Sequence, residues 1–356
     1  HEGIKYQGGR CPSPALFRQS WEYPSHTSFS KERIIVHNDG PYYDDFEHGM
    51  TIPPLPAVTV TDADNVAYRM ITGDQHFASA NRGAYQRISG STGALVNPGL
   101  VMQYAIGQTT NATRKAIANL YYRSVRILRP VEVGETITTS TTVLGLADAR
   151  PKDDKHRGKV WLGIETVGDN GPVAQYERCA LVASRSGSPG HSSDIPGPSD
   201  PAPLQDLTAL VPNWNLEGVP VATWGLGETR VDAMRDHIDL APSLARMTFN
   251  QAFVHRDGSA SIYGKRLVYG GHVQGLAQAS LSRVLPGVAA IVAWDGCDHV
   301  GPAFEGDLLE FRHELKETLP VPGGQLMRFE IRAATVDERG VAGSDILVWT
   351  PIVFAP

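Results

Sequence analysis

Features that would place a chain in a special structural class are scarce in this sequence of 356 residues. Cysteine occurs only three times, at distant positions and with no C-x-x-C spacing, which excludes a disulfide framework and a cysteine zinc site. The longest apolar stretch, near 284–294, is interrupted by Pro286 and Gly287 and is shorter than the about 18–20 residues of a membrane span. Isolated thiols are typical of a reducing compartment, so we predict a cytoplasmic protein with no membrane partner and no metal site.

The sequence also has no long run of basic residues. It contains 32 Lys and Arg against 38 Asp and Glu, for a net charge of −6, which argues against a nucleic-acid partner. Hydrophobic residues make up 41% and charged residues 20%, a balance typical of globular domains. At about 100–200 residues per domain, the length predicts two domains or one large one.

Composition shifts divide the chain into four segments. Residues 1–41 are rich in proline, serine and aromatics without periodicity, and we interpret them as an N-terminal arm. Residues 185–204 contain little that could form a core, and we interpret this Pro/Ser/Gly segment as a linker. The linker separates two domains of similar size, predicted at 42–184 and 205–356.

The two halves contain similar blocks in the same order, with one four-residue change in spacing. The paired blocks are 72–79 with 248–255, 95–102 with 267–274, and 129–137 with 301–309. Three blocks in a shared order predict a tandem structural repeat.

Each half also predicts the same secondary structure. An apolar helix follows Pro98-Gly99 in the first half and Gly270-Gly271 in the second. Alternation of apolar and polar residues over 160–165, 309–314 and 327–333 predicts antiparallel strands with one buried face. One apolar helix followed by about four such strands, twice, is an α+β plan in which each sheet wraps a central helix. Pairing of the two sheets edge to edge would form one continuous sheet and remove an exposed edge.

The motifs that carry chemistry resemble those of a known family. T-G-D-Q-H-F-A-S at 72–79 resembles the motif of the MaoC-like enoyl-CoA hydratases and dehydratases, small-Gly-Asp-x-Asn-Pro-apolar-His, and Tyr68 fits the same pattern. N-P-G-L-V-M at 97–102 and R-P-V-E-V-G-E-T at 129–136 are also similar to that family. The resemblance covers nearly all of 42–356, and within the family it is closest in appearance to the mesaconyl-CoA hydratases.

The resemblance implies a tandem, or double, hot-dog fold and a hydro-lyase. The expected reaction is reversible hydration of a 2-enoyl-CoA thioester, with a short, branched or carboxylated acyl group as a candidate. The expected cofactor is none beyond the CoA of the acyl-CoA substrate, because the thioester itself activates the double bond.

The catalytic pair of the family, an Asp with a His five residues later, is divided between the halves. Asp74 is present, but Ser79 stands five residues later; His255 is present, but Asn250 stands five residues earlier. His255 is the side chain best suited to move protons near neutral pH, and Asn250 could orient a water by its amide. Asp74 with His76 is an alternative acid–base pair. Each also has a structural interpretation: a loop histidine for His255, and a turn-capping carboxylate for Asp74.

Five further residues are candidates for substrate binding. Gly270, Gly271 and His272 begin the second apolar helix, where free N–H groups suit a thioester oxygen, and Gly99 is the counterpart in the first half. Arg266 could hold a substrate carboxylate or pair with a surface Glu. The glycines could equally serve close packing of the helix on its sheet.

Two other functions stay open at this point. An acyl-CoA thioesterase would direct water at the carbonyl carbon, and a degenerate acyl-CoA binding protein would catalyse nothing. We expect two pseudo-symmetric pockets, and we favour the one that holds Asn250 and His255 over the one with Asp74, His76 and Ser79. Because one chain contains both hot-dog units, we expect a monomeric pseudo-dimer or a homodimer.

Overall fold

The structure of the chain is a computed structural model that describes residues 39–152, 154–198, 200–221 and 223–356. Residues 40–356 form one compact unit. The predicted arm at 1–41 lies outside the described residues except at its last few positions.

The first half contains a group of helices followed by four long strands. Its elements are η1 (Tyr43–Asp45), β1 (Thr51–Ile52), β2 (Val58–Thr59), α1 (Asp62–Thr72), α2 (Phe77–Ala80), α3 (Arg82–Ser89), α4 (Pro98–Gly107), η2 (Thr110–Thr113), β3 (Ala116–Ile127), β4 (Thr136–Lys152), β5 (Lys155–Gly168) and β6 (Gly171–Ala183). The helix predicted after Pro98-Gly99 is α4, with proline in its first turn, and the Asn97 side chain caps it by accepting from the Gly99 N–H at 2.8 Å.

The second half repeats this order. Its elements are η3 (Leu204–Leu210), β7 (Thr229–Val231), β8 (Asp236–His237), α5 (Ala241–Met247), η4 (Phe253–His255), η5 (Gly258–Ala260), α6 (Gly270–Val284), β9 (Ala290–Asp298), β10 (Leu308–Val321), β11 (Gly324–Val336) and β12 (Ala342–Ala355). The helix predicted at Gly270-Gly271 is α6, and most of its residues are buried.

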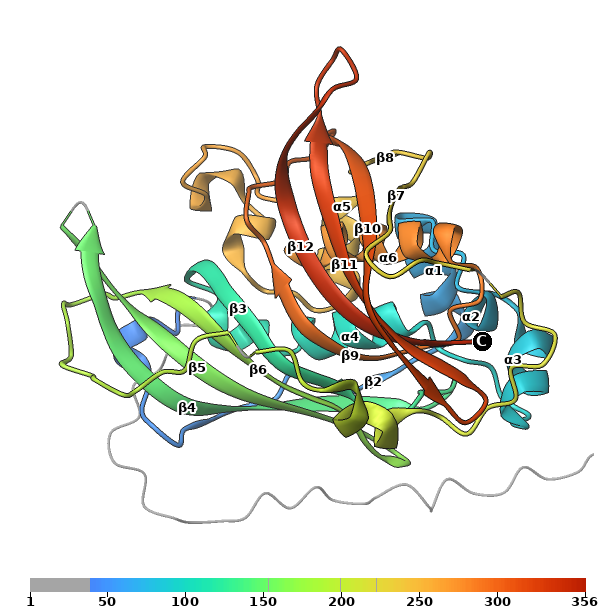
Figure 1. The fold of residues 1–356 in the computed structure, drawn as a ribbon. Coiled ribbons are helices and arrows are strands. Elements are labelled where there is room, and N and C mark those ends of the chain that lie inside the picture. Colours follow the sequence, from blue (N-terminus) through green and yellow to red (C-terminus); the bar gives the residue numbers. More distant parts are fainter. Residues whose placement is uncertain (1–38, 153, 199, 222) are drawn as a thin grey trace, which may run out of the picture. The chain divides into compact units, whose positions relative to one another are not determined.

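One antiparallel sheet runs through both halves, in the order β1-β4-β5-β6-β3-β9-β12-β11-β10-β7 (Figure 1). The halves join where β3 pairs with β9, at Val125 opposite Trp294 and Arg126 opposite Ala293. The helix α6 contacts β10, β11 and β12, and the Tyr176 hydroxyl of β6 donates to the Ala105 carbonyl of α4 at 3.2 Å. The predicted α+β fold, with two helix-wrapping sheets continuous with each other, is confirmed.

The central helices also contact each other through polar side chains. Gln103 of α4 donates from Nε2 to the Gly271 carbonyl at 3.0 Å and to Gln274 Oε1 at 2.8 Å, both on α6. Buried polar bonds of this kind fix how two helices dock, because an unpaired amide there would be costly.

The segment predicted as a linker connects the halves without regular structure of its own until η3 begins at Leu204. It lies along β4 through an isolated bridge between Ala147 and Ser192, and the Asp148 N–H donates to the His191 carbonyl at 2.9 Å. The division at 185–204 stays a prediction, since residues 40–356 cluster as one unit.

Candidate active site

A cavity of about 550 Å³ is built from both halves of the chain. The second half contributes the segments around η4 and the start of α6, and the first contributes η2, β3 and part of β6. Its polar and charged lining includes Thr110, Thr113, Arg114, Lys115, Asn119, Tyr122, Arg178, Asn250, His255, Ser261, Tyr263, Tyr269 and His299. Among the described residues, no Asp or Glu lines this cavity.

Asn250 reaches the cavity because the chain reverses sharply after α5. Phe249 has a left-handed backbone (φ 60°), and the Asn250 N–H donates back to the Ala245 carbonyl at 2.9 Å. The side-chain Oδ1 accepts from the Ala252 N–H at 3.0 Å. A backbone N–H must face an acceptor, so this bond identifies the oxygen and leaves the Nδ2 amide as a donor for a ligand.

His255 is held at the end of η4 by a single fixed bond. Its Nδ1 lies 3.0 Å from the Leu267 carbonyl, which can only accept, so Nδ1 carries the proton and Nε2 keeps a lone pair. Burial lowers the pKa of His255 to about 4, and the charges of Arg178, Arg256 and Arg266 act in the same direction. At neutral pH the ring is therefore an uncharged base.

The start of α6 forms one wall of this cavity. The first N–H groups of a helix have no acceptor within it, and here the His272 N–H turns back to the Tyr269 carbonyl at 2.8 Å. Gly270 lines the cavity, and a Cβ at this position would lie 2.4 Å from Nε2 of His299. Glycine thus lets the His299 ring lie against the first turn and leaves the helix N-terminus accessible to an oxyanion.

The other predicted substrate-binding residues lie elsewhere. Gly271 packs on α4, because a Cβ there would lie 2.0 Å from Oε1 of Gln103, and His272 is fully buried outside the cavity lining. A Cβ at Gly99 would lie 2.4 Å from the Tyr68 hydroxyl, so this glycine serves close packing. Arg266 pairs with Glu305 at 3.0 Å, the surface interpretation named above. A role for these residues in substrate binding stays a prediction.

Asp74 lies in a closed hydrogen-bond network. Its carboxylate, 1% exposed, accepts four bonds. The donors are the His76 N–H at 3.0 Å and the Ser282 hydroxyl at 2.6 Å on Oδ1, and Asn97 Nδ2 at 2.8 Å and Gln278 Nε2 at 2.7 Å on Oδ2. Two of these donors, Gln278 and Ser282, come from α6. The carboxylate therefore joins the two halves of the chain.

His76 has both ring nitrogens occupied. Nδ1 accepts from the Ser79 N–H at 3.3 Å and caps α2, so Nε2 carries the proton and donates to the Ala289 carbonyl at 3.1 Å. Burial lowers the pKa of His76, which keeps the ring neutral. The structure brings Asp74, His76 and Ser79 together, as the sequence suggested, and gives them structural partners.

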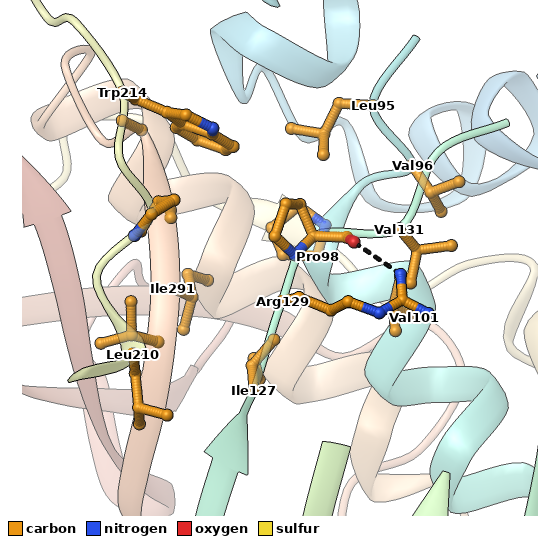
Figure 2. Close-up of a pocket in the computed structure, with 15 residues that line it drawn as sticks. Leu95, Val96, Pro98, Val101, Ile127, Arg129, Val131, Leu210, Trp214 and Ile291 are labelled. Atoms are coloured by element: carbon orange, nitrogen blue, oxygen red, sulfur yellow. Dashed lines mark hydrogen bonds between the residues drawn. The ribbon is translucent and has the colours of Figure 1, made fainter. Parts of the chain in front are cut away.

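A second cavity occupies the position in the first half that corresponds to the large one. It measures about 30 Å³, close to the space of one water molecule. Figure 2 shows the residues that line it. Its lining repeats that of the large cavity at matching positions: Leu95, Val96, Pro98, Val101, Pro130 and Val131 correspond to Leu267, Val268, Gly270, Val273, Pro302 and Ala303. Leu210, Pro212 and Trp214 also line it, and the space that remains is too small for an acyl group.

Sequence analysis missed several charged or titratable residues of the large cavity, among them Arg178 and His299. Arg178 lies in β6 in phase with the buried residues Tyr176, Ala180 and Val182. Alternation therefore places the arginine on the inner face of the sheet. A charged residue at a position where the strand pattern predicts burial could have identified this cavity residue from the sequence. His299 follows the last residue of β9, and burial lowers its pKa to about 4.

Two other classes of site have no support among the described residues. Cys179 and Cys297 are free and buried, and no group of three or more His, Cys, Asp or Glu residues is arranged to hold a metal ion in the described part of the chain. Within that same part, no helix is both long and apolar enough to cross a membrane.

Comparison with known proteins agrees with this architecture. No profile of a known protein family matches the chain. The β-methylmalyl-CoA dehydratase of Chloroflexus aurantiacus is 28% identical over 309 residues, 80% of this chain and 85% of the relative. The mesaconyl-CoA hydratase of Cereibacter sphaeroides is 27% identical over 317 residues, 83% of this chain and 90% of the relative.

Solved structures show the same fold. A conserved hypothetical protein of Mycobacterium tuberculosis, described as a double hot-dog fold, has a TM-score of 0.78 and 29% identity over 88% of this chain and 98% of its own. A MaoC domain dehydratase from Chloroflexus aurantiacus has a TM-score of 0.79 and 24% identity over 90% of this chain and 98% of its own. The fold is therefore a double hot-dog. The chain is similar to MaoC-like hydratases and dehydratases, the family that its motifs resemble.

Proposed function

We propose that the chain is a hydro-lyase that reversibly hydrates a 2-enoyl-CoA thioester in the large cavity. The observation that carries this proposal is the joint presence of a neutral histidine, an amide donor and a helix N-terminus in one 550 Å³ space. The two curated relatives, a CoA-thioester dehydratase and a CoA-thioester hydratase, support the same reaction type.

In the proposed mechanism each group performs one step. The Asn250 amide donates to the oxygen of a water molecule, and the water donates to Nε2 of His255. His255 removes the proton while the hydroxide adds to the β-carbon, and the negative charge that develops on the thioester oxygen is stabilised by N–H groups at the start of α6. The histidine then returns the proton to the α-carbon. Water is thereby added across the double bond, and the histidine ends in its starting state.

The reaction as proposed uses no cofactor or metal beyond the CoA of the substrate. Adding hydroxide next to a thioester places charge on the carbonyl oxygen, so the substrate supplies its own activation. The protein contributes a base and oriented donors, which are the groups found here. We propose a monomer, because one chain supplies both walls of the cavity; a homodimer is the alternative. We also propose a cytoplasmic location, since isolated thiols are typical of a reducing compartment.

The assay follows two signals with crotonyl-CoA and mesaconyl-CoA as substrates. Hydration removes the absorbance of the conjugated enoyl thioester without releasing free thiol. His255→Asn should lower the hydration rate by about 10²–10⁴-fold, the usual loss when a general base is removed, with little change in melting temperature. Release of thiol would instead indicate a thioesterase, and binding without turnover would indicate an acyl-CoA binding protein.

A further inference from the structure

Arg178 is a buried charge in the wall of the large cavity. It is 4% exposed and lies on β6, in the first half of the chain. Nη1 donates to the hydroxyl of Thr109 at 2.9 Å and Nη2 to the hydroxyl of Thr113 at 2.7 Å. A guanidinium has five N–H donors, so two are used, and Nε has no acceptor among the described residues.

Among the described residues, Arg328 is the other buried arginine, and it is paired with a carboxylate, 2.7 Å from Asp295. The partly buried Arg283 likewise lies 2.6 Å from Asp232. Arg178 makes no ion pair with any carboxylate that the structure describes; both of its bonds are to neutral hydroxyls. Burying a charge without a counter-ion is expensive, and the cost is recovered if a ligand supplies the opposite charge.

The surrounding lining is suited to a negatively charged ligand. Arg114 and Lys115 line the same cavity, and no acidic side chain of the described residues does, although the chain as a whole has a net charge of −6. Arg114 and Lys115 are only partly buried, which fits contact with the large phosphates of a nucleotide. Arg178 is more deeply buried. Its planar guanidinium keeps unused N–H donors, which match a small planar carboxylate that can accept two parallel bonds.

Arg178 also lies close to the proposed base. Its positive charge acts on His255 and on Tyr269, the residue immediately before α6. Arg178, His255 and Gly270 line one cavity, so an acyl group whose thioester meets the start of α6 can extend toward the guanidinium.

We propose that Arg178 is a specificity-determining residue that binds a carboxylate at the far end of the acyl group. The preferred substrates are then short 2-enoyl-CoA thioesters whose acyl group carries a second carboxyl group. This inference rests on the proposed function, and it goes further by naming the side chain that selects a carboxylated acyl group.

The test compares mesaconyl-CoA, which carries a second carboxyl group and a methyl branch, with crotonyl-CoA, which carries neither. Arg178→Met should lower kcat/KM for mesaconyl-CoA by about 10²-fold or more, because it removes the charge-assisted bonds to the substrate carboxylate. The value for crotonyl-CoA should change by less than about 5-fold. Arg178→Lys, which keeps the charge but not the fork, should recover part of the preference.

Arg114→Met is the matched control, because it removes a second cation of the same cavity. It should change kcat/KM for both thioesters by a similar factor. An equal loss for both substrates in Arg178→Met would show a merely structural role and overturn the proposal, as would a wild-type preference for crotonyl-CoA. If Arg178→Met does not fold, Arg178→Lys decides by the same ratio.

Binding measurements separate this proposal from the proposed function. Calorimetric titration of the wild-type chain and Arg178→Lys with each thioester reads selectivity without turnover. Tighter binding of mesaconyl-CoA by the wild type, reduced in the variant, supports the carboxylate site even if neither thioester is hydrated. Equal binding of both thioesters by the wild type contradicts it even if both are hydrated.

Discussion

Replacing Asp74 by asparagine distinguishes a structural carboxylate from a catalytic one. The two side chains have the same shape, but one carboxylate oxygen becomes an NH₂ group that faces donors. In the better orientation this NH₂ group lies at the Oδ1 position, where the Ser282 hydroxyl can rotate to accept while the His76 N–H loses its partner. The bonds from Asn97 and Gln278 to the remaining oxygen lose their charge assistance.

The magnitude follows from these bonds. Losing one buried bond and weakening two others costs roughly 2–4 kcal/mol, after allowance for the charge that no longer has to be buried. The melting temperature should fall by roughly 3–6 °C. At 25 °C the folded variant should keep its kcat, because Asp74 does not line the large cavity. The assays are a thermal melt and hydration kinetics on one preparation. A loss of activity of 10²-fold or more with an unchanged melting temperature would refute this reasoning and move the chemistry to the first half.

Three further outcomes are expected. Asn250→Asp places a carboxylate beside His255 and raises its pKa above about 4, so the acidic limb of the pH–rate profile should move to higher pH. Gly270→Ala should lower kcat by about 10²-fold, because the new Cβ displaces the His299 ring or the first turn of α6, whereas Gly275→Ala in the same helix should leave kcat unchanged. Burial lowers the pKa of His272 to about 4, below the unfolded value of about 6.5, so the unfolded chain binds the proton first. Its contribution to stability is complete above pH 6.5 and is lost as pH falls to about 4, by on the order of 3 kcal/mol; urea unfolding at pH 7 and pH 5 should show a smaller difference in His272→Gln.

Much of the fold was predictable because it depends on short-range patterns. Proline at the start of α4, glycine at the start of α6 and strict alternation in β5, β10 and β11 each specify a local structure on their own. The similarity of the two halves then limits the topology, since repeated units can bury their edges on each other. The pairing of β3 with β9 follows from that requirement.

The site was less predictable because its two halves come from distant parts of the chain. The sequence identified Asn250, His255 and Gly270, which lie in the second half and share one cavity with residues of β3 and β6. It could not show that Trp214 lines the matching space in the first half, because that contact depends on where the chain runs after the linker. Nor does a count of charges reveal which arginine has no carboxylate partner. Only the structure shows that Arg178 bonds to a hydroxyl whereas Arg328 pairs with Asp295.

The single continuous sheet has a consequence for how many ligands one chain can hold. Two identical subunits related by a twofold axis must present the same residues at both of their pockets. Joining the halves in one polypeptide releases that constraint, and here one position holds about 550 Å³ and its counterpart about 30 Å³. We therefore expect each chain to bind one ligand rather than two. The first-half position can instead stabilise the contact between the halves, because Asp74 accepts hydrogen bonds from two residues of α6 in the other half.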